Sequence, residues 1–327
     1  MKILVTIYSS FAVWNIPASY VESLRRAFPQ HTFLHATTEA EALALIADAD
    51  VIFAGQVDRS HLAAATALRW IHSPAAGVGG MLYPEMVASP IVITNSRGMS
   101  ADTIGEHVVA VTMALFRRLP LAIRRQVQHD WAMDEISAPP GNRTIAGSRA
   151  LIVGFGAIGT AAGRRLADLG AEVSAIRRNT SAPGPPWLHE LGSPDQMRAL
   201  LPRADIVAIC APETSGTQRF IGAPELAAMR PEGVLVNVSR GKLVDESALV
   251  EALRSGAIAG AALDVFEHEP LNATSPLWDL PNVLITPHTS GFRVDHWDAA
   301  TALFSENLRR FDAGQPLLNV VDKQAGY

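Results

Sequence analysis

Short apolar runs and amphipathic segments alternate along most of this chain of 327 residues. The short runs are typical of β-strands, whereas the segments between them repeat their apolar positions at helical spacing. In the first third of the chain, the strand-like runs are 3–7, 51–53, 68–72 and 91–94, and the helical segments include 18–27 and 39–48. Such alternation predicts parallel βαβ units with helices on the faces of the sheet.

A second series of the same kind occupies the later part of the chain. Its strand-like runs are 150–153, 172–176, 206–210, 234–238, 259–263 and 283–286. Between the two series, a long helical pattern covers 100–119, and Pro120 predicts a kink or break in it. After residue 288 only an amphipathic helix, 297–311, remains, and its apolar face needs a partner.

This length exceeds what one hydrophobic core usually serves, so we expect two α/β domains. We expect the last helix to return to the first domain, which is then discontinuous. The prediction is a flavodoxin-like substrate-binding domain, 1–98 with 289–327, and a Rossmann dinucleotide-binding domain, 99–288. Both are predicted to be doubly wound parallel sheets, with the active site in the cleft between them.

Composition narrows the class of protein. Apolar residues make up 48% and charged residues 18%, as in ordinary folded, soluble proteins, and the net charge of −5 favours neither nucleic acid nor an anionic membrane as a partner. The single cysteine, Cys210, cannot form an internal disulfide, which fits a cytoplasmic protein. The first apolar run is too short for a signal peptide, and no run reaches membrane-spanning length.

A glycine motif follows the first strand of the second series. Residues 151–159 read LIVGFGAIG, so an apolar strand enters a G-x-G-x-x-G turn, and a helix of small residues follows. The first glycine permits the tight turn, the second lets the backbone approach a pyrophosphate, and the third lets helix and strand pack closely. The motif predicts dinucleotide binding, with the phosphates at the helix N-terminus. The residues expected there are Gly154, Gly156, Ala157, Ile158 and Gly159.

The next strand distinguishes the two nicotinamide cofactors. In NAD-binding proteins an acidic residue about 20 positions past the glycines binds the ribose hydroxyls. Here the strand 172–176 is followed by Arg177 and Arg178, and Glu172 stands at its opposite end. Two guanidinium groups favour a 2′-phosphate, although a pair of solvated arginines is the alternative interpretation. We therefore favour NADP(H), with NAD(H) possible.

Three later turns carry residues that can do chemistry. Arg240 follows the strand 234–238, Asp264 and Glu269 follow the next strand, and His288 follows the last one. In open α/β sheets, such positions lie at the edge where ligands bind. Taken singly, each has an ordinary alternative: a surface arginine, a solvated carboxylate or a structural histidine. No histidine or cysteine spacing indicates a metal site, so we expect none.

The joint occurrence of these segments resembles the D-isomer-specific 2-hydroxyacid dehydrogenases, in particular the glyoxylate/hydroxypyruvate reductase branch. The resemblance covers nearly the whole chain. The segments that carry it are 73–78 (SPAAGV), 104–108 (IGEHV), the glycine motif, 237–241 (NVSRG), 264–270 (DVFEHEP), 286–288 (TPH) and the tail 318–327.

The resemblance implies roles for three side chains. Arg240 would bind the carboxylate of a 2-oxo acid and polarise its carbonyl group. His288 would donate the proton, because an imidazole titrates near working pH. Glu269 would favour the charged imidazolium and fix its ring.

The resemblance also implies further ligand contacts. Backbone amides of a glycine turn would meet the substrate carboxylate, although a plain turn is the alternative, and Gly79-Gly80 stand where many members have an aspartate. Asp264 would meet the nicotinamide carboxamide. The residues expected at the substrate carboxylate are Ala76, Gly77 and Val78, and the further residues expected at the cofactor are Ala211, Pro212, Val238 and Ser239.

The expected activity is reduction of a small 2-oxo acid to the D-2-hydroxy acid, and the family implies a homodimer. A phosphoglycerate dehydrogenase is an alternative, but residues 73–82 offer no cation for a phosphate. A second alternative is a nucleotide-sensing protein that is not an enzyme, like the corepressors that share this fold. The complete Arg240, Glu269 and His288 set argues against it.

Overall fold

The computed structural model describes residues 1–139 and 141–326, so Tyr327, which ends the tail motif, lies outside the described residues. The chain divides into two compact units. The first unit is Met1–Met99 with Arg293–Tyr327, and the second unit is Ser100–Phe292. These boundaries fall one residue after the predicted 98 and four residues after the predicted 288.

The first unit is built on a five-stranded parallel sheet in the order β2-β1-β3-β4-β5. This is the strand order of flavodoxin-like folds. The strands are β1 (Lys2–Thr6), β2 (Thr32–His35), β3 (Val51–Ala54), β4 (Trp70–His72) and β5 (Val92–Thr94). Four of these strands were predicted, and β2, a short edge strand with polar residues at both ends, was not.

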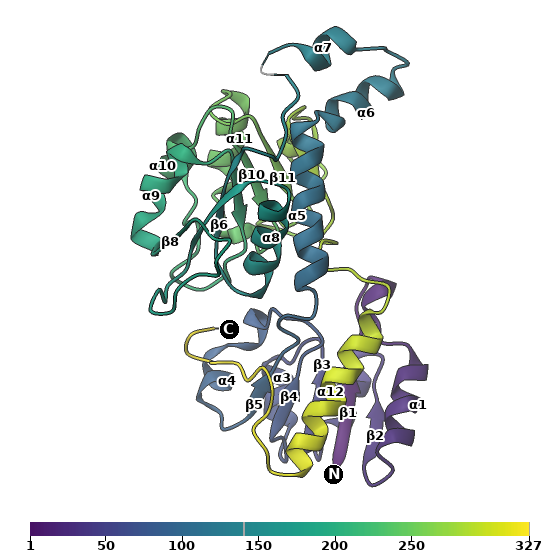
Figure 1. Cartoon of the computed structure of the whole chain (residues 1–327). Helices are drawn as coiled ribbons and strands as arrows, with labels where there is room; N and C mark the ends of the chain where they lie inside the picture. The colour runs from purple at the N-terminus through teal and green to yellow at the C-terminus, as the bar shows by residue number, and fades with distance from the viewer. Residues whose placement is uncertain (140, 327) are drawn as a thin grey trace. The chain divides into compact units, whose positions relative to one another are not determined.

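Five helices belong to the first unit: α1 (Ala18–Ala27), α2 (Glu39–Leu45), α3 (Arg59–Ala64), α4 (Pro84–Ala88) and α12 (His296–Asp312). The apolar stripe of α12 packs on the sheet, beside α1 (Figure 1). The Phe304 ring stacks on Phe53 with centroids 4.5 Å apart and on Trp70 at 5.5 Å. This aromatic packing is what the amphipathic pattern of the last helix requires.

The second unit contains a seven-stranded parallel sheet in the order β12-β11-β10-β9-β6-β7-β8. Its strands are β6 (Arg149–Val153), β7 (Glu172–Ile176), β8 (Glu190–Gly192), β9 (Ile206–Ile209), β10 (Val234–Asn237), β11 (Gly260–Leu263) and β12 (Val283–Ile285). Six of these were predicted, and β8, three residues long at the sheet edge, was not. Both sheets are parallel with helices around them, as the predicted fold class requires.

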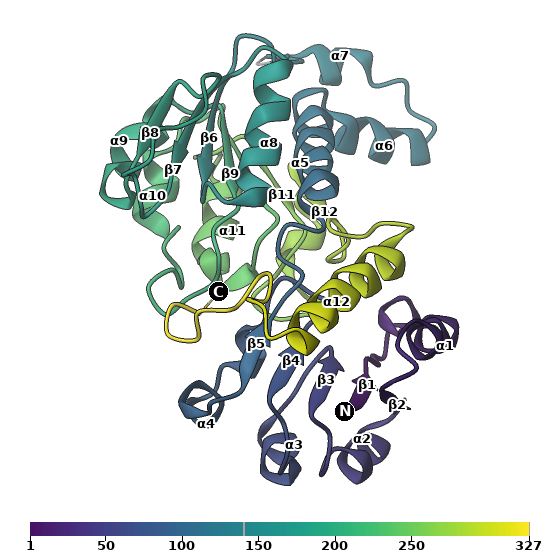
Figure 2. The same ribbon diagram turned by 60° about the horizontal axis from the view of Figure 1, so that its bottom comes forward.

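Helices cover both faces of the second sheet: α5 (Ala101–Phe116), α8 (Ala157–Asp168), α9 (Met197–Leu200), α10 (Ala223–Ala228) and α11 (Glu246–Arg254). The second unit also contains α6 (Leu119–Val127) and α7 (Met133–Ser137). α5 and α8 lie side by side in both views (Figures 1 and 2). Gly105 permits this contact, because a Cβ there would lie 3.0 Å from the Ala161 carbonyl carbon of α8.

The long helical pattern breaks where Pro120 predicted a break. α5 ends at Phe116, Arg118 takes a left-handed conformation with φ of 53°, and α6 then begins with Pro120 in its first turn. α6 and α7 extend beyond the end of α5, away from the second sheet (Figure 1). Among the described residues, no helix is both long and apolar enough to cross a membrane.

Candidate active site

The predicted cofactor and catalytic residues of the second unit gather along one edge of its sheet. The strands are all parallel, so their carboxyl ends meet at that edge. The glycine motif follows β6, the arginine pair follows β7, and the turns with Arg240, Glu269 and His288 follow β10, β11 and β12. The chain crosses from β8 to β9, on the other side of β6, so the glycine turn lies at the switch point of the sheet, where ligands bind in such folds.

The glycine turn has the geometry expected of a pyrophosphate site. Gly154 has φ of 99°, and a Cβ there would lie 2.3 Å from the Ala211 amide nitrogen. A Cβ on Gly159 would lie 2.1 Å from the Gly154 carbonyl oxygen, whereas one on Gly156 would meet no described atom within 4 Å. The first hydrogen bond of α8 runs from the Thr160 N–H to the Gly156 carbonyl, so the preceding amides point out of the helix end.

The β7 end carries cationic groups. Arg177 is partly buried and donates from Nη2 to the Ala182 carbonyl in the following loop. Its Nε is buried and has no hydrogen-bond partner among the described residues. Arg178 beside it is exposed, and Glu172 stands at the far end of the strand. The β7 end therefore offers guanidinium donors and no carboxylate of its own.

Two of the further residues predicted at the cofactor, Ala211 and Ser239, contact the glycine turn or each other. Ala211, directly after β9, is buried against Gly154. Ser239, after β10, donates its hydroxyl proton to the Ala211 carbonyl, and Val238 is buried beside it. These contacts give Ala211 and Val238 a packing role, and their cofactor contacts stay predictions.

Arg240 is held on a turn that packs against the neighbouring loop. Asn237 donates its side-chain amide to the Arg240 carbonyl at 3.0 Å and accepts from the Ser239 N–H at 3.1 Å. A Cβ on Gly241 would lie 1.8 Å from the Phe266 carbonyl carbon. Only glycine permits this close approach. Arg240 then lies near enough to Glu269 for the guanidinium charge to lower the pKa of that carboxyl group.

Glu269 and His288 form a direct pair. The His288 Nδ1 lies 2.6 Å from Glu269 Oε2, and Glu269 Oε1 accepts the Phe266 N–H at 2.9 Å. Burial acts to raise the pKa of Glu269, but the hydrogen bonds from His288 and Phe266 and the charge of Arg240 outweigh it and lower that pKa. The carboxylate therefore stays ionised at neutral pH and faces the imidazole.

The His288 backbone is strained and held in place. Its φ is 54°, which is unusual for a residue with a side chain, and its N–H donates to the Asp264 carbonyl at 2.8 Å. The Asp264 carboxylate is buried and accepts the N–H groups of Thr289 at 2.8 Å and Ser290 at 3.0 Å. Asp264 thus fixes the turn that presents His288. Its predicted contact with nicotinamide stays a prediction.

A further contact reaches this turn from α5. The Thr286 hydroxyl donates to Asp264 at 2.6 Å and lies 3.3 Å from His107 Nε2. Because the hydroxyl proton is directed at Asp264, His107 is the donor in the second contact. Burial lowers the pKa of His107. From the sequence, His107 was predicted only as part of the 104–108 motif, and no role was predicted for Thr286. The signal that could have found the contact was a histidine on a helix that packs on β11.

The predicted carboxylate loop belongs to the first unit, which is described by itself. Ala76 and Gly77 are exposed after β4, and Val78 is buried in the core. Asn95 donates its side-chain amide to the Ala76 carbonyl at 2.7 Å, and Ser96 N–H donates to the Ala75 carbonyl at 3.1 Å. Hydrogen bonds therefore hold the loop in place, while its residues Ala76 and Gly77 remain exposed.

Comparison with known proteins places this arrangement in a family. Residues 109–290 match the sequence model of the D-isomer specific 2-hydroxyacid dehydrogenase, NAD binding domain. A glyoxylate reductase from Korarchaeum cryptofilum is 32% identical over 272 residues, 82% of this chain and 80% of that protein. A D-3-phosphoglycerate dehydrogenase from Mycobacterium tuberculosis is 32% identical over 288 residues, 87% of this chain but 53% of that protein.

Solved structures agree over the full length. The NADPH-dependent glyoxylate/hydroxypyruvate reductase from Sinorhizobium meliloti, solved with NADP and sulfate, superposes with a TM-score of 0.84 at 26% identity and covers 100% of both chains. Sequence identity above 30% over four fifths of the chain, and a family match over more than half of it, support the same conclusion. This chain belongs to the D-isomer specific 2-hydroxyacid dehydrogenases, oxidoreductases that act on CH–OH groups.

Proposed function

We propose that this protein uses NADPH to reduce a small 2-oxo acid, of the glyoxylate or hydroxypyruvate kind, to the D-2-hydroxy acid (achiral from glyoxylate). The observation that carries the proposal is the 2.6 Å pair of His288 and Glu269, beside Arg240, on the sheet edge that carries the glycine turn. An acid, its orienting carboxylate and a cation are the groups that reduction of a 2-oxo acid requires.

The residues present fit the cofactor. The space around Gly156 admits a pyrophosphate, and the amides of Ala157 and Ile158 lie at the α8 N-terminus. Arg177, with its buried Nε, and Arg178 would bind the 2′-phosphate that distinguishes NADPH. When bound, NADPH supplies the hydride.

His288 would supply the proton. Its Nδ1 is engaged by Glu269, so Nε2 is the ring nitrogen that remains for the substrate oxygen. The ionised Glu269 holds the ring in one orientation and stabilises its protonated form, because the carboxylate charge opposes that of the imidazolium. Proton transfer from Nε2 to the developing alkoxide leaves the ring neutral.

Arg240 would bind the substrate carboxylate and polarise the carbonyl that receives the hydride. Its guanidinium is permanently charged, and a charge-assisted bond strengthens as negative charge develops on the oxygen. The open tip of the 76–78 loop in the first unit would add backbone amides to the carboxylate site.

Relatives support the substrate class and leave one alternative. The glyoxylate reductase from Korarchaeum cryptofilum and the D-3-phosphoglycerate dehydrogenase from Mycobacterium tuberculosis are each 32% identical to this chain. The loop 73–82 contains no lysine or arginine, which favours an unphosphorylated substrate. A panel assay with NADPH or NADH against glyoxylate, hydroxypyruvate, pyruvate, phenylpyruvate and phosphohydroxypyruvate tests this. We expect the first two substrates with NADPH to be fastest; a preference for NADH or for the phosphorylated acid would contradict the proposal.

Arg240→Ala tests the catalytic assignment. We expect kcat/KM for the 2-oxo acid to fall by about 10²–10³, as for loss of a donor that stabilises a transition-state oxyanion. The dissociation constant for NADPH, measured by fluorescence titration, should change little. Lys242→Ala, an exposed cation two residues away, is the matched control. Near-normal turnover by the Arg240 variant would show that the assignment is wrong.

Assembly is the last part of the proposal: two copies of the chain associate through α6 and α7 of the second unit. Apolar side chains remain exposed there, in a single stretch of chain. They are Leu119, Ile123, Val127, Trp131 and Met133. Contiguous exposed apolar surface of this kind marks interaction sites.

A further inference from the structure

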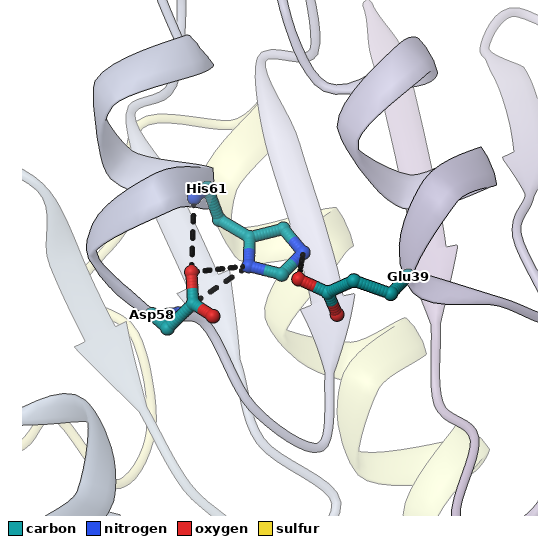
Figure 3. Close-up of side chains that lie close together, drawn as sticks. All are labelled: Glu39, Asp58 and His61. Carbon is teal, nitrogen blue, oxygen red and sulfur yellow. Dashed lines mark hydrogen bonds and ion pairs between the residues drawn. The ribbon is translucent and has the colours of Figure 1, made fainter.

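A group of side chains in the first unit plays no part in the proposed reaction. Glu39 is the first residue of α2, Asp58 caps α3, and His61 stands in the first turn of α3. One ligand atom of each lies within 4.8 Å of the others. Figure 3 shows the two carboxylates on opposite sides of the imidazole ring. Because Glu39 lies 19 positions before Asp58, no histidine or cysteine spacing in the sequence indicates this group.

Asp58 fixes the proton on one nitrogen of the ring. Asp58 Oδ1 lies 2.8 Å from His61 Nδ1 and accepts the His61 N–H at 3.1 Å. Ser60 and the His61 backbone N–H both donate hydrogen bonds to the same oxygen, so Asp58 Oδ1 acts as an acceptor and the ring Nδ1–H is its third donor. The Asp58 amide is 3.5 Å from the same nitrogen, too far to compete. In the neutral ring, the lone pair is therefore on Nε2.

That lone pair is buried and unsatisfied. The His61 side chain is 4% exposed, and Nε2 has no hydrogen-bond partner among the described residues. The atom it faces is Glu39 Oε1, 3.6 Å away. Tyr8 donates its hydroxyl proton to the other oxygen of Glu39 at 2.5 Å. In the neutral ring, two electron-pair donors thus face each other across 3.6 Å.

We propose that His61 Nε2 and Glu39 Oε1 bind a divalent transition metal of the zinc class, with Asp58 as the group that orients the ring. The separation of 3.6 Å is too long for a hydrogen bond. It is close to the ~3.3–3.4 Å between two ligands at ~2.0–2.1 Å in a tetrahedral shell. An imidazole nitrogen with carboxylate oxygen suits Zn²⁺, and a carboxylate on the second ring nitrogen is the usual outer partner of a metal-bound histidine.

The metal would clamp two helices of the first unit. Glu39 is on α2 and His61 on α3, which pack together, and the side chain of Glu39 is 52% exposed, so water can complete the coordination shell. Tyr83 donates its hydroxyl proton to the Asp58 carbonyl at 2.7 Å, which links the site to the segment after the 76–78 loop. Occupancy therefore stabilises the first unit and is independent of cofactor chemistry.

Zinc titration of the tag-free full chain, after dialysis against a chelator, tests the site. We expect one equivalent of Zn²⁺ per chain by competition with a chromophoric chelator, and a higher thermal unfolding temperature with zinc than without it. Co²⁺ at the site should give a visible absorption band from nitrogen and oxygen ligands. Absence of stoichiometric binding would overturn the proposal.

Glu39→Gln is the deciding variant, because the exposed side chain can change without loss of the fold. We expect it to weaken Zn²⁺ binding at least about tenfold and to abolish the zinc-dependent thermal shift. Glu22→Gln, an exposed glutamate on α1 of the same unit, is the matched control and should bind as the unaltered chain does. Equal affinity in the Glu39 variant and the control would show that zinc binds elsewhere. Asp58→Asn should lower the affinity about 10–100-fold through the ring orientation.

Discussion

At the scale of single residues, Glu269 joins two turns of the proposed active site. One of its oxygens accepts the Phe266 backbone N–H after β11, and the other faces the His288 ring after β12. His288 is in turn held in a left-handed backbone conformation by Asp264. Strain of this kind persists only where neighbouring contacts fix it, and such positions concentrate at functional sites.

Glu269→Gln should separate proton donation from binding. Glutamine can still accept the Phe266 N–H but has no charge to stabilise the protonated His288 ring. We expect kcat to fall about 10²-fold and KM for NADPH to stay within a factor of about two. Steady-state kinetics with saturating glyoxylate, in which NADPH is varied up to saturation, measures both constants. His268→Gln, an exposed histidine next in sequence, should behave as the unaltered enzyme, and a Glu269 variant with unchanged kcat would exclude the role.

The buried His72 should make stability depend on pH. Its ring lies among Phe53, Trp70 and Phe304, it is fully buried, and burial lowers its pKa to about 3. The unfolded chain binds a proton near pH 6.5, whereas the folded chain does not, so stability falls as the pH drops below 6.5. This residue contributes up to ~1.4 kcal/mol per pH unit between about pH 6 and pH 4.

Urea unfolding at several pH values measures how the free energy of unfolding changes with pH. In His72→Phe, the free energy of unfolding should change less steeply with pH between pH 6 and pH 4.5. The difference should correspond to about one bound proton, because phenylalanine keeps the aromatic packing and does not titrate. Identical slopes in the variant and the unaltered protein would show that His72 is not the group responsible.

At the scale of elements, the turn between β6 and α8 combines two kinds of constraint. A Cβ on Gly159 would lie 2.1 Å from the Gly154 carbonyl oxygen, whereas a Cβ on Gly156 would meet no described atom within 4 Å. Gly159 is therefore required by the fold itself. Gly156 is required only when a pyrophosphate approaches the backbone.

Gly156→Ala and Gly159→Ala should therefore fail in different ways. We expect Gly156→Ala to keep the unfolding temperature within a few degrees but to weaken NADPH binding at least about tenfold, since one added methyl occupies the phosphate approach. Gly159→Ala should lose about 2–4 kcal/mol of stability, because strand and helix must separate. Calorimetry with and without NADPH distinguishes the two, and equal loss of stability in both variants would contradict the assignment.

Secondary structure was predictable where an apolar run or a helical spacing of apolar residues extended over several positions. The strands β6, β9 and β10 are apolar apart from Arg149 at the start of β6 and Asn237 at the end of β10, and the break after α5 follows from Pro120. β2 and β8 were missed because these short edge strands mix polar with apolar residues, whereas β5 and β12, which are equally short edge strands, are mostly apolar and were predicted. Arg240, Glu269 and His288 could be proposed from their turns and their family resemblance, and the contact of Glu269 with His288 agrees with that proposal. The contact of His107 with Thr286 could not, because it joins residues 179 positions apart.

At the scale of the whole molecule, the second unit presents apolar side chains that its own core does not use. Along α6, the following turn and α7, Val127 is 77% exposed, Trp131 90% and Met133 64%. A chain with net charge −5 and pI near 6.1 gains solubility from its charges, so a cluster of this kind on a projecting segment favours a contact with another surface.

Sedimentation or light scattering should therefore give a mass of about twice the 35.0 kDa of one chain. We expect Trp131→Glu with Val127→Glu to shift the protein to monomers, because a buried aromatic anchor carries much of an interface's binding energy and an unpaired carboxylate there is costly. Val294→Glu is the control, since that side chain is fully exposed in the first unit and the change leaves α6 and α7 intact. A monomeric unaltered chain, or a double variant that remains dimeric, would show that these helices do not mediate assembly.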